Sequence, residues 1–70
     1  MDRIERKSTM DHIYIALVER GYRPDDQIIG FILTGDPTYI TNQNGARRLI
    51  GKVDRHYLLC DMISSYLSAK

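Results

Sequence analysis

The sequence predicts an all-α fold of four main short helices and a short helical turn. Apolar residues recur at spacings of three and four in several segments, which is the periodicity of a helix face. Residues that start and stop helices separate these segments. No segment alternates between apolar and polar residues as a half-buried strand does. The 70 residues hold no Pro- or Ser-rich linker, so we expect a single helical domain over residues 1–70.

The first predicted helix ends at Gly21, because glycine commonly terminates a helix in a left-handed conformation. One apolar stripe along this helix consists of Met10, Ile13, Tyr14 and Leu17. A second stripe consists of Ile4, Ile15 and Val18. Four short helices have little surface with which to cover both stripes. We therefore expect the second stripe to meet another subunit.

Two starting points are compatible with this first helix. Ser8 and Asp11 resemble a capping box, which would leave residues 1–8 as a frayed lead-in. The alternative is a longer helix that begins at about Arg3.

The second predicted helix begins at Pro24, a residue that suits the first helical position. Asp25 and Asp26 follow in its first turn, where negative charge complements the helix dipole. A metal-ligating role for the two aspartates is the rarer alternative. The apolar stripe of this helix consists of Ile28, Ile29, Ile32 and Leu33, widened by Phe31.

The tripeptide Gly35-Asp36-Pro37 stops the apolar run of residues 28–34. Gly35 suits the end of the second helix, while Asp36 and Pro37 suit the cap and first position of a turn over 38–40. A phosphate-binding loop would need a run of backbone amides and a lysine, which this segment lacks. We interpret the tripeptide as a structural turn.

Two further helices complete the prediction. Thr41 or Asn42 can cap the third helix, which is expected to end near Gly51. Its apolar positions are Ala46, Leu49 and Ile50. Asp54 can cap the fourth. The broad apolar stripe of that helix consists of Leu58, Leu59, Met62, Ile63, Tyr66 and Leu67.

Charge and hydropathy exclude several classes of function. Ten Lys and Arg residues oppose nine Asp and Glu residues, so the net charge provides little attraction to nucleic acid. The longest unbroken apolar run, Ile13–Val18, is far shorter than the roughly 18 residues of a membrane span. The charged residues 1–7 precede no apolar region of the kind that a signal peptide needs. We expect a cytoplasmic protein without membrane contact.

Chain length and cysteine content favour self-association. A domain of this size buries only about 60 % of the surface that its unfolded chain exposes. Cys60 has no second cysteine with which to form a disulfide, and a lone thiol suits a reducing compartment. Oligomerisation is the remaining common means of stabilising so short a chain. We predict a two-fold symmetric homodimer, with the following interface residues: Ile13, Ile15, Val18, Leu59 and Ile63.

Cys60 and His56 form a second pair that could serve catalysis or metal binding. They stand four residues apart on one predicted helix, within reach of each other. A nucleophile–base pair would also need an orienting group and an oxyanion site. A metal site would need a further ligand, and His12 is the only other histidine. We interpret the pair as a buried cysteine beside a surface histidine, and we expect no enzyme activity, metal or cofactor.

Four basic residues, Arg47, Arg48, Lys52 and Arg55, lie in a stretch whose only acid is Asp54. On one continuous helix, Arg48, Lys52 and Arg55 would share a face, with Arg47 at its side. Three interpretations remain: a solvated face, a surface that binds an acidic protein partner, or the recognition helix of a helix-turn-helix DNA-binding dimer. The third requires a connection of three to four residues, and the one here is longer.

Several short motifs occur in a characteristic order between residues 10 and 67. They are Tyr14-x-Ala16-Leu17, Gly21-Tyr22-x-Pro24, Gln27-Ile28-x-Gly30, Gly35-Asp36-Pro37-x-Tyr39-Ile40, Ala46-Arg47 and Tyr66-Leu67. Together they resemble the small IreB/ReoM-type regulatory phosphoproteins of Gram-positive bacteria. This chain departs from that pattern at Asn42 and Gly51, where members of the family are often richer in arginine.

The resemblance implies a helical homodimer that is a substrate of a membrane Ser/Thr kinase and has no enzyme activity. Such proteins restrain peptidoglycan synthesis by promoting proteolysis of the enzyme that commits UDP-N-acetylglucosamine to the wall, and phosphorylation relieves this effect. The implied partners are that enzyme or a protease adaptor, and the kinase. With this resemblance we favour the second interpretation of Arg47, Arg48, Lys52 and Arg55, a surface that binds a protein partner. The family's phosphorylated threonine lies in a flexible tail ahead of the first helix. Ser8 and Thr9 align with the helix instead, so the phosphorylation site stays unassigned.

Overall fold

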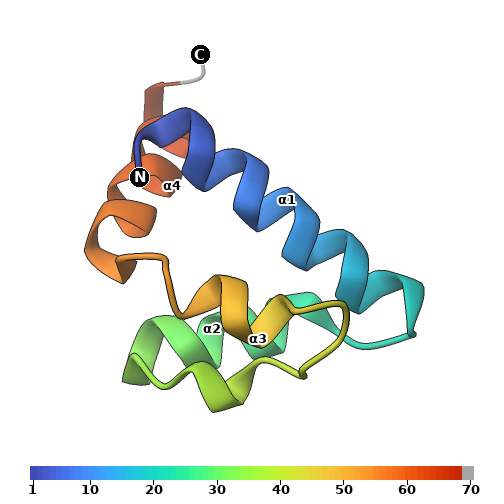
Figure 1. The fold of residues 1–70 in the computed structure, drawn as a ribbon. Helices are drawn as coiled ribbons and strands as arrows, with labels where there is room; N and C mark the ends of the chain where they lie inside the picture. The colour runs from blue at the N-terminus through green and yellow to red at the C-terminus, as the bar shows by residue number, and fades with distance from the viewer. Residues whose placement is uncertain (69–70) are drawn as a thin grey trace.

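The computed structural model describes residues 1–68, and within them all regular structure is helical. The last two residues of the expected 1–70 domain, Ala69 and Lys70, lie outside the described residues. The elements are α1 (Arg3–Glu19), α2 (Pro24–Thr34), the 3₁₀ turn η1 (Pro37–Tyr39), α3 (Ala46–Ile50) and α4 (Arg55–Ser68). Helix α1 lies along the pair formed by α2 and α3, and α4 runs past the beginning of α1 (Figure 1). The prediction of an all-α fold is confirmed.

Helix α1 takes the longer of the two predicted starts. Asp2 is its N-cap, and the Asp2 carboxylate accepts a hydrogen bond from the Glu5 amide at 2.8 Å. Ser8 and Thr9 therefore lie inside the helix and cap nothing. At the other end Gly21 has φ +79°, and the Tyr22 amide donates to the Leu17 carbonyl at 3.0 Å. This is the Schellman arrangement that the glycine predicted.

The core forms where α1, α2 and α3 meet. Ile13 and Leu17 are fully buried, and they pack with Ala46 and Ile50 from α3. The buried residues described are Ile13, Ala16, Leu17, Phe31, Ile40, Ala46, Ile50, Val53 and Leu58. Only one member of the broad apolar stripe on α4, Leu58, is buried. The core thus leaves most of α4 uncovered.

Helix α2 presents a different face to the core from the predicted one. Phe31 is its buried residue, with Ile28 and Ile32 partly buried. Ile29 and Leu33 are exposed, so their predicted burial is wrong. Residues three apart share a helix face, and once Ile28 and Phe31 point inward, Ile29 and Leu33 fall on the opposite side. An isoleucine-rich run cannot show by itself which of its sides is covered.

The end of α2 follows the prediction. Gly35 has φ +75°, a region that L side chains rarely adopt, and its amide donates to the Phe31 carbonyl at 2.7 Å. Asp36 then caps η1, because its carboxylate accepts hydrogen bonds from the amide and the hydroxyl of Thr38. These bonds lower the pKa of Asp36, with a smaller contribution from the charge of Arg47. The tripeptide acts as a structural turn.

Helix α3 is shorter than predicted and begins at Ala46, so neither Thr41 nor Asn42 is its cap. Thr41 is held instead by Gln27 of α2: its amide donates to the Gln27 carboxamide oxygen at 2.8 Å, and its hydroxyl accepts from the amide nitrogen at 2.9 Å. Asn44 and Gly45 both have positive φ, which prevents helix from extending backward through them. The predicted end near Gly51 is confirmed.

Gly30 allows η1 to pack closely on α2. A Cβ atom at this position would lie only 2.9 Å from Cγ of Tyr39. A methyl group there would have to displace the ring, which is half exposed. Glycine at position 30 therefore permits the observed contact between α2 and η1.

An ion pair joins the beginning of α1 to the middle of α4. Arg6 donates to both carboxylate oxygens of Asp61, with distances of 2.6 Å and 3.0 Å. A third guanidinium nitrogen donates to the Met1 carbonyl, and the Arg6 Cζ lies 5.3 Å from the centroid of the Tyr57 ring. Arg6 lowers the pKa of Asp61, mainly by hydrogen bonding. We call this pair the α1–α4 clamp.

Replacing Gly30 with alanine should destabilise the fold by about 1–2 kcal/mol, because the new methyl group overpacks the contact with Tyr39. Gly51→Ala is the matched control. Gly51 has φ −62°, and a Cβ there would meet only ordinary contacts. Its replacement should change stability by less than about 0.5 kcal/mol or increase it. Urea unfolding followed by circular dichroism measures both, and equal stabilities would show that the Gly30 contact is not required.

Replacing Asp61 with asparagine should destabilise the protein at neutral pH and have progressively less effect in acid. The folded protein holds the Asp61 pKa below its ordinary value of 3.8, so the clamp stabilises the fold above that pH. The stabilisation is lost as the pH falls through the lowered pKa. Urea midpoints of the wild type and variant should therefore converge below pH 3.8.

Asp11→Asn is the control, because Asp11 forms only an exposed pair with Lys7. It should have little effect at any pH. A constant difference between wild type and Asp61→Asn across the acid range would contradict the assigned role of the clamp.

Candidate interaction surfaces

The basic residues expected to bind a partner belong to three different parts of the chain. Arg47 and Arg48 lie on α3, Lys52 lies in the following turn, and Arg55 is the first residue of α4. Because α3 ends at Ile50, these residues do not share one helix face, and that part of the prediction is wrong.

Two of the four basic side chains also fix the fold. The Arg47 Nε donates to the Ile40 carbonyl at 2.9 Å, which ties α3 to the end of η1. Arg55 donates to the Ile32 carbonyl at 3.1 Å, and its guanidinium lies against Gly35. The positive charge of Arg55 thus lies near the C-terminus of α2, where it offsets the partial negative charge of the helix dipole. Arg48 and Lys52 form no hydrogen bond of this kind among the described contacts and are exposed.

The basic residues have no acidic partner within the described part of the chain. The ion pairs found there join Arg3 and Arg6 to Asp61, Lys7 to Asp11, and Arg23 to Asp26. None includes Arg47, Arg48, Lys52 or Arg55. These four cations form no ion pair with a described carboxylate, and only Arg47 is near enough to one, Asp36, to lower its pKa. An acidic partner can therefore contribute negative charge to them. We call these four residues the basic surface.

The second candidate surface is apolar and lies on α1 and α4. Ile15 and Val18 are exposed on the side of α1 opposite the buried Leu17. Leu59 and Ile63 are exposed one turn apart on α4. We call these four residues the apolar faces. Ile13 was also expected at the dimer interface, but it is fully buried in the chain's own core and has no surface to offer.

Other large apolar side chains are exposed as well. Further exposed large apolar residues on the four helices are Ile4, Tyr14, Ile29, Leu33, Tyr57, Met62, Tyr66 and Leu67. Single exposed apolar residues are common on soluble proteins, but contiguous patches mark interaction sites. Runs such as Leu59, Met62, Ile63 and Tyr66 on one helix are of the second kind.

Cys60 and His56 do lie close together, with 3.7 Å between Sγ and Nε2. Cys60 is exposed, so its predicted burial is wrong. His12 is engaged elsewhere, because its Nε2 lies 3.3 Å from the Asn44 carbonyl oxygen. Residues 1–68 contain no group of three His, Cys, Asp or Glu side chains placed to hold a metal ion. Asp26 pairs with Arg23 at 3.1 Å in the first turn of α2.

The geometry does not form a helix-turn-helix unit from α2 and α3. Helix α3 has only five residues, and residues 35–45 separate it from α2. A recognition helix enters the major groove and reads bases from its first turns, with a connection of about three to four residues before it. In addition, no helix within residues 1–68 is long and apolar enough to cross a bilayer.

Sequence patterns gave no indication of the α1–α4 clamp. Arg6 and Asp61 stand 55 residues apart, and neither belongs to an apolar stripe or a recognisable motif. Charge pairs at such a separation follow only from the packing of the helices. The Gln27–Thr41 contact was missed for the same reason, although Gln27 is a polar residue within an otherwise apolar helix.

These surfaces define a small helical protein that offers an apolar and a basic surface for binding, with no metal-binding cluster among residues 1–68. A family model described as IreB regulatory phosphoprotein matches residues 1–68. The chain therefore belongs to the IreB family of regulatory phosphoproteins. The resemblance recognised in the motifs of residues 10–67 is confirmed.

Proposed function

We propose that this chain is a noncatalytic regulator that acts through protein contacts, in the control of peptidoglycan precursor synthesis by a Ser/Thr kinase. Membership of a family of regulatory phosphoproteins supports the regulatory role. The partner in this proposal is the enzyme that commits UDP-N-acetylglucosamine to the wall, or an adaptor that delivers that enzyme to a protease. The protein acts in the cytoplasm, where such partners are found.

The observation that carries the proposal is the basic surface. Its four cations have no carboxylate within ion-pair distance in the described chain. Arg47 and Arg55 each donate a hydrogen bond to a backbone carbonyl, whereas Arg48 and Lys52 form no described hydrogen bond and are available to a partner. An arginine can bind a carboxylate through two parallel hydrogen bonds, so Arg48 is suited to an acidic side chain at the partner's surface.

The proposal includes a homodimer formed through the apolar faces. Burial of an aliphatic side chain contributes about 1.5–3 kcal/mol, and Ile15, Val18, Leu59 and Ile63 are all available for burial. In a two-fold symmetric dimer, each of the two subunits would bury its own copy of these residues. Such an interface would leave Arg47, Arg48 and Lys52 free, because α3 and the turn after it carry none of the four apolar residues. Arg55 lies one turn before Leu59 on α4 and would border the interface.

Kinase control in this proposal has no assigned site. Ser8 and Thr9 lie inside α1, where the helix would have to open before the extended backbone could enter a kinase. Ser8 is exposed and Thr9 is partly buried. We assign phosphorylation to neither residue.

The double variant Arg48→Ala/Lys52→Ala should abolish regulation while leaving the fold intact, because neither side chain has a described hydrogen bond or ion pair within the chain. The measurement is the half-life of the wall-committing enzyme in cells that carry the variant in place of the wild type. We expect a half-life as long as in cells lacking the protein. The single variant Arg48→Lys should retain regulation only in part, since lysine cannot form the paired hydrogen bonds that arginine forms with a carboxylate.

Arg20→Ala is the matched control, because Arg20 is an exposed cation at the end of α1 and outside the basic surface. It should give the wild-type half-life. Circular dichroism must show that all variants are folded. If the wall-committing enzyme has its wild-type half-life in cells with the folded double variant, the basic residues do not bind a partner and are only a solvated surface.

A further inference from the structure

A groove of about 490 Å³ lies between α1 and α4. No residue of the basic surface lines it, but Met62 and Tyr66 of its lining belong to the exposed run of α4 that also contains Leu59 and Ile63. Its apolar lining comes from Met10 on α1 and from Leu58 and Met62 on α4. The part on α4 extends from Leu58 to Tyr66, which is about 12 Å at 1.5 Å per residue. That length matches about two turns of a helix laid into the groove.

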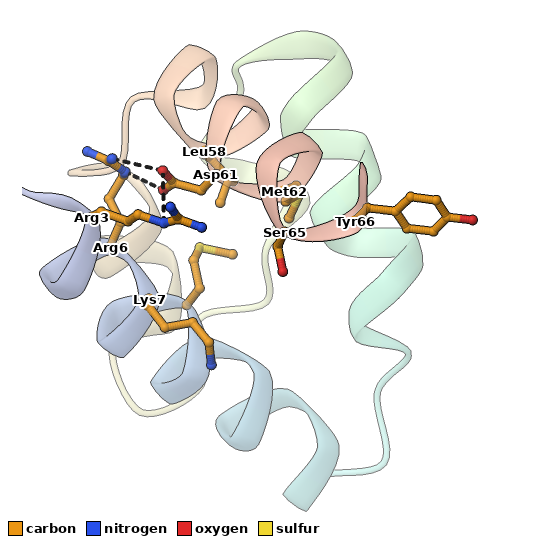
Figure 2. Close-up of a pocket in the computed structure, with 9 residues that line it drawn as sticks. Arg3, Arg6, Lys7, Leu58, Asp61, Met62, Ser65 and Tyr66 are labelled. Carbon is orange, nitrogen blue, oxygen red and sulfur yellow. Dashed lines mark hydrogen bonds and ion pairs between the residues drawn. The ribbon is translucent and has the colours of Figure 1, made fainter. Parts of the chain in front are cut away.

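The charged lining of the groove is mostly positive. Arg3, Arg6 and Lys7 line it from α1, and the only carboxylate in the lining is Asp61. Figure 2 shows Asp61 between Arg3 and Arg6 at one end of the groove, with the Tyr66 ring pointing away from it. In a chain with nearly balanced charge, this local excess of cations is a specific feature.

The three cations differ in how firmly they are engaged. Arg6 is committed to Asp61 through two hydrogen bonds. Arg3 lies 3.9 Å from the same carboxylate and is largely exposed. Lys7 pairs with Asp11, which is outside the groove, and both side chains are exposed, so the pair is readily exchanged. Arg3 and Lys7 are therefore available to carboxylates of a bound molecule.

We propose that the α1–α4 groove binds an acidic amphipathic helix of a partner protein, with its apolar side chains on the methionines and its carboxylates on Arg3 and Lys7. Methionine is flexible and polarisable, so Met10 and Met62 can adapt to leucine-like side chains. The cations match an acidic flank on the helix. The apolar lining distinguishes the site from one for a small inorganic anion. The inference is independent of the basic surface.

The probe is a short amidated helix of glutamate and alanine that carries two leucines four positions apart. It is titrated into protein labelled with ¹³C in the methionine methyl groups. The chain has three methionines, so the spectrum is simple to assign. The signals of Met10 and Met62 should shift and saturate, while that of Met1, which does not line the groove, should stay unchanged. A peptide with lysine in place of glutamate should produce no saturable shift.

Two variants separate the apolar and charged contributions. Met62→Asp should weaken probe binding by about tenfold or more, and Arg3→Glu by about threefold to tenfold. The matched controls are Ile29→Asp and Arg23→Glu, which alter exposed residues of the same types outside the groove. Both should bind as the wild type does, and circular dichroism confirms folding.

Four outcomes would overturn the proposal. They are an absence of saturable shifts, equal binding of the lysine peptide, equal losses in the control variants, and shifts produced without the probe. In the last case, shifts that follow protein concentration alone would assign the groove to a second copy of the chain. Shifts on addition of vesicles of phosphatidylcholine and phosphatidylglycerol would assign it to a membrane surface.

Discussion

A chain of 70 residues cannot cover all of its apolar side chains, and this constraint governs much of the structure. The covered part is a small cluster where α1 packs on α3, centred on Ile13, Leu17 and Ile50. Helix α4 contributes little to it beyond Leu58. Most apolar residues of α4 and one side of α1 therefore remain on the surface. The same shortage of core that limits the stability of one chain provides the surfaces on which the proposed regulator acts.

Polar contacts compensate for the small core by fixing the long connection between α2 and α3. Gln27 holds Thr41, Arg47 holds the Ile40 carbonyl, and His12 lies against the Asn44 carbonyl. Several of these residues are also the ones that carry the resemblance to the IreB family. Gln27, Gly30 and Arg47 have structural explanations here, because each positions the connection. These three motif residues therefore help to form the fold, whereas other motif residues such as Tyr14 and Tyr66 are exposed.

The sequence predicted those parts of the fold that depend on neighbouring residues. Gly21, Pro24 and Asp54 ended or started helices as expected, because caps act on the adjacent turn. Features set by tertiary packing were missed or misjudged. The covered side of α2, the late start of α3 and the α1–α4 clamp all depend on contacts between distant segments. The prediction of the candidate site was the least accurate. It placed the basic residues on one continuous helix, but α3 ends at Ile50 and the residues are divided among α3, the following turn and α4.

The central claim is that a second copy of the chain covers the apolar faces and so completes a core that one chain cannot. The most direct test is urea unfolding at protein concentrations that span about two orders of magnitude, followed by circular dichroism. When folding and association are coupled, mass action raises the unfolding midpoint with protein concentration. We predict such a rise. A midpoint that stays constant over the whole range would show that the single chain is stable without a partner copy, and would contradict the claim.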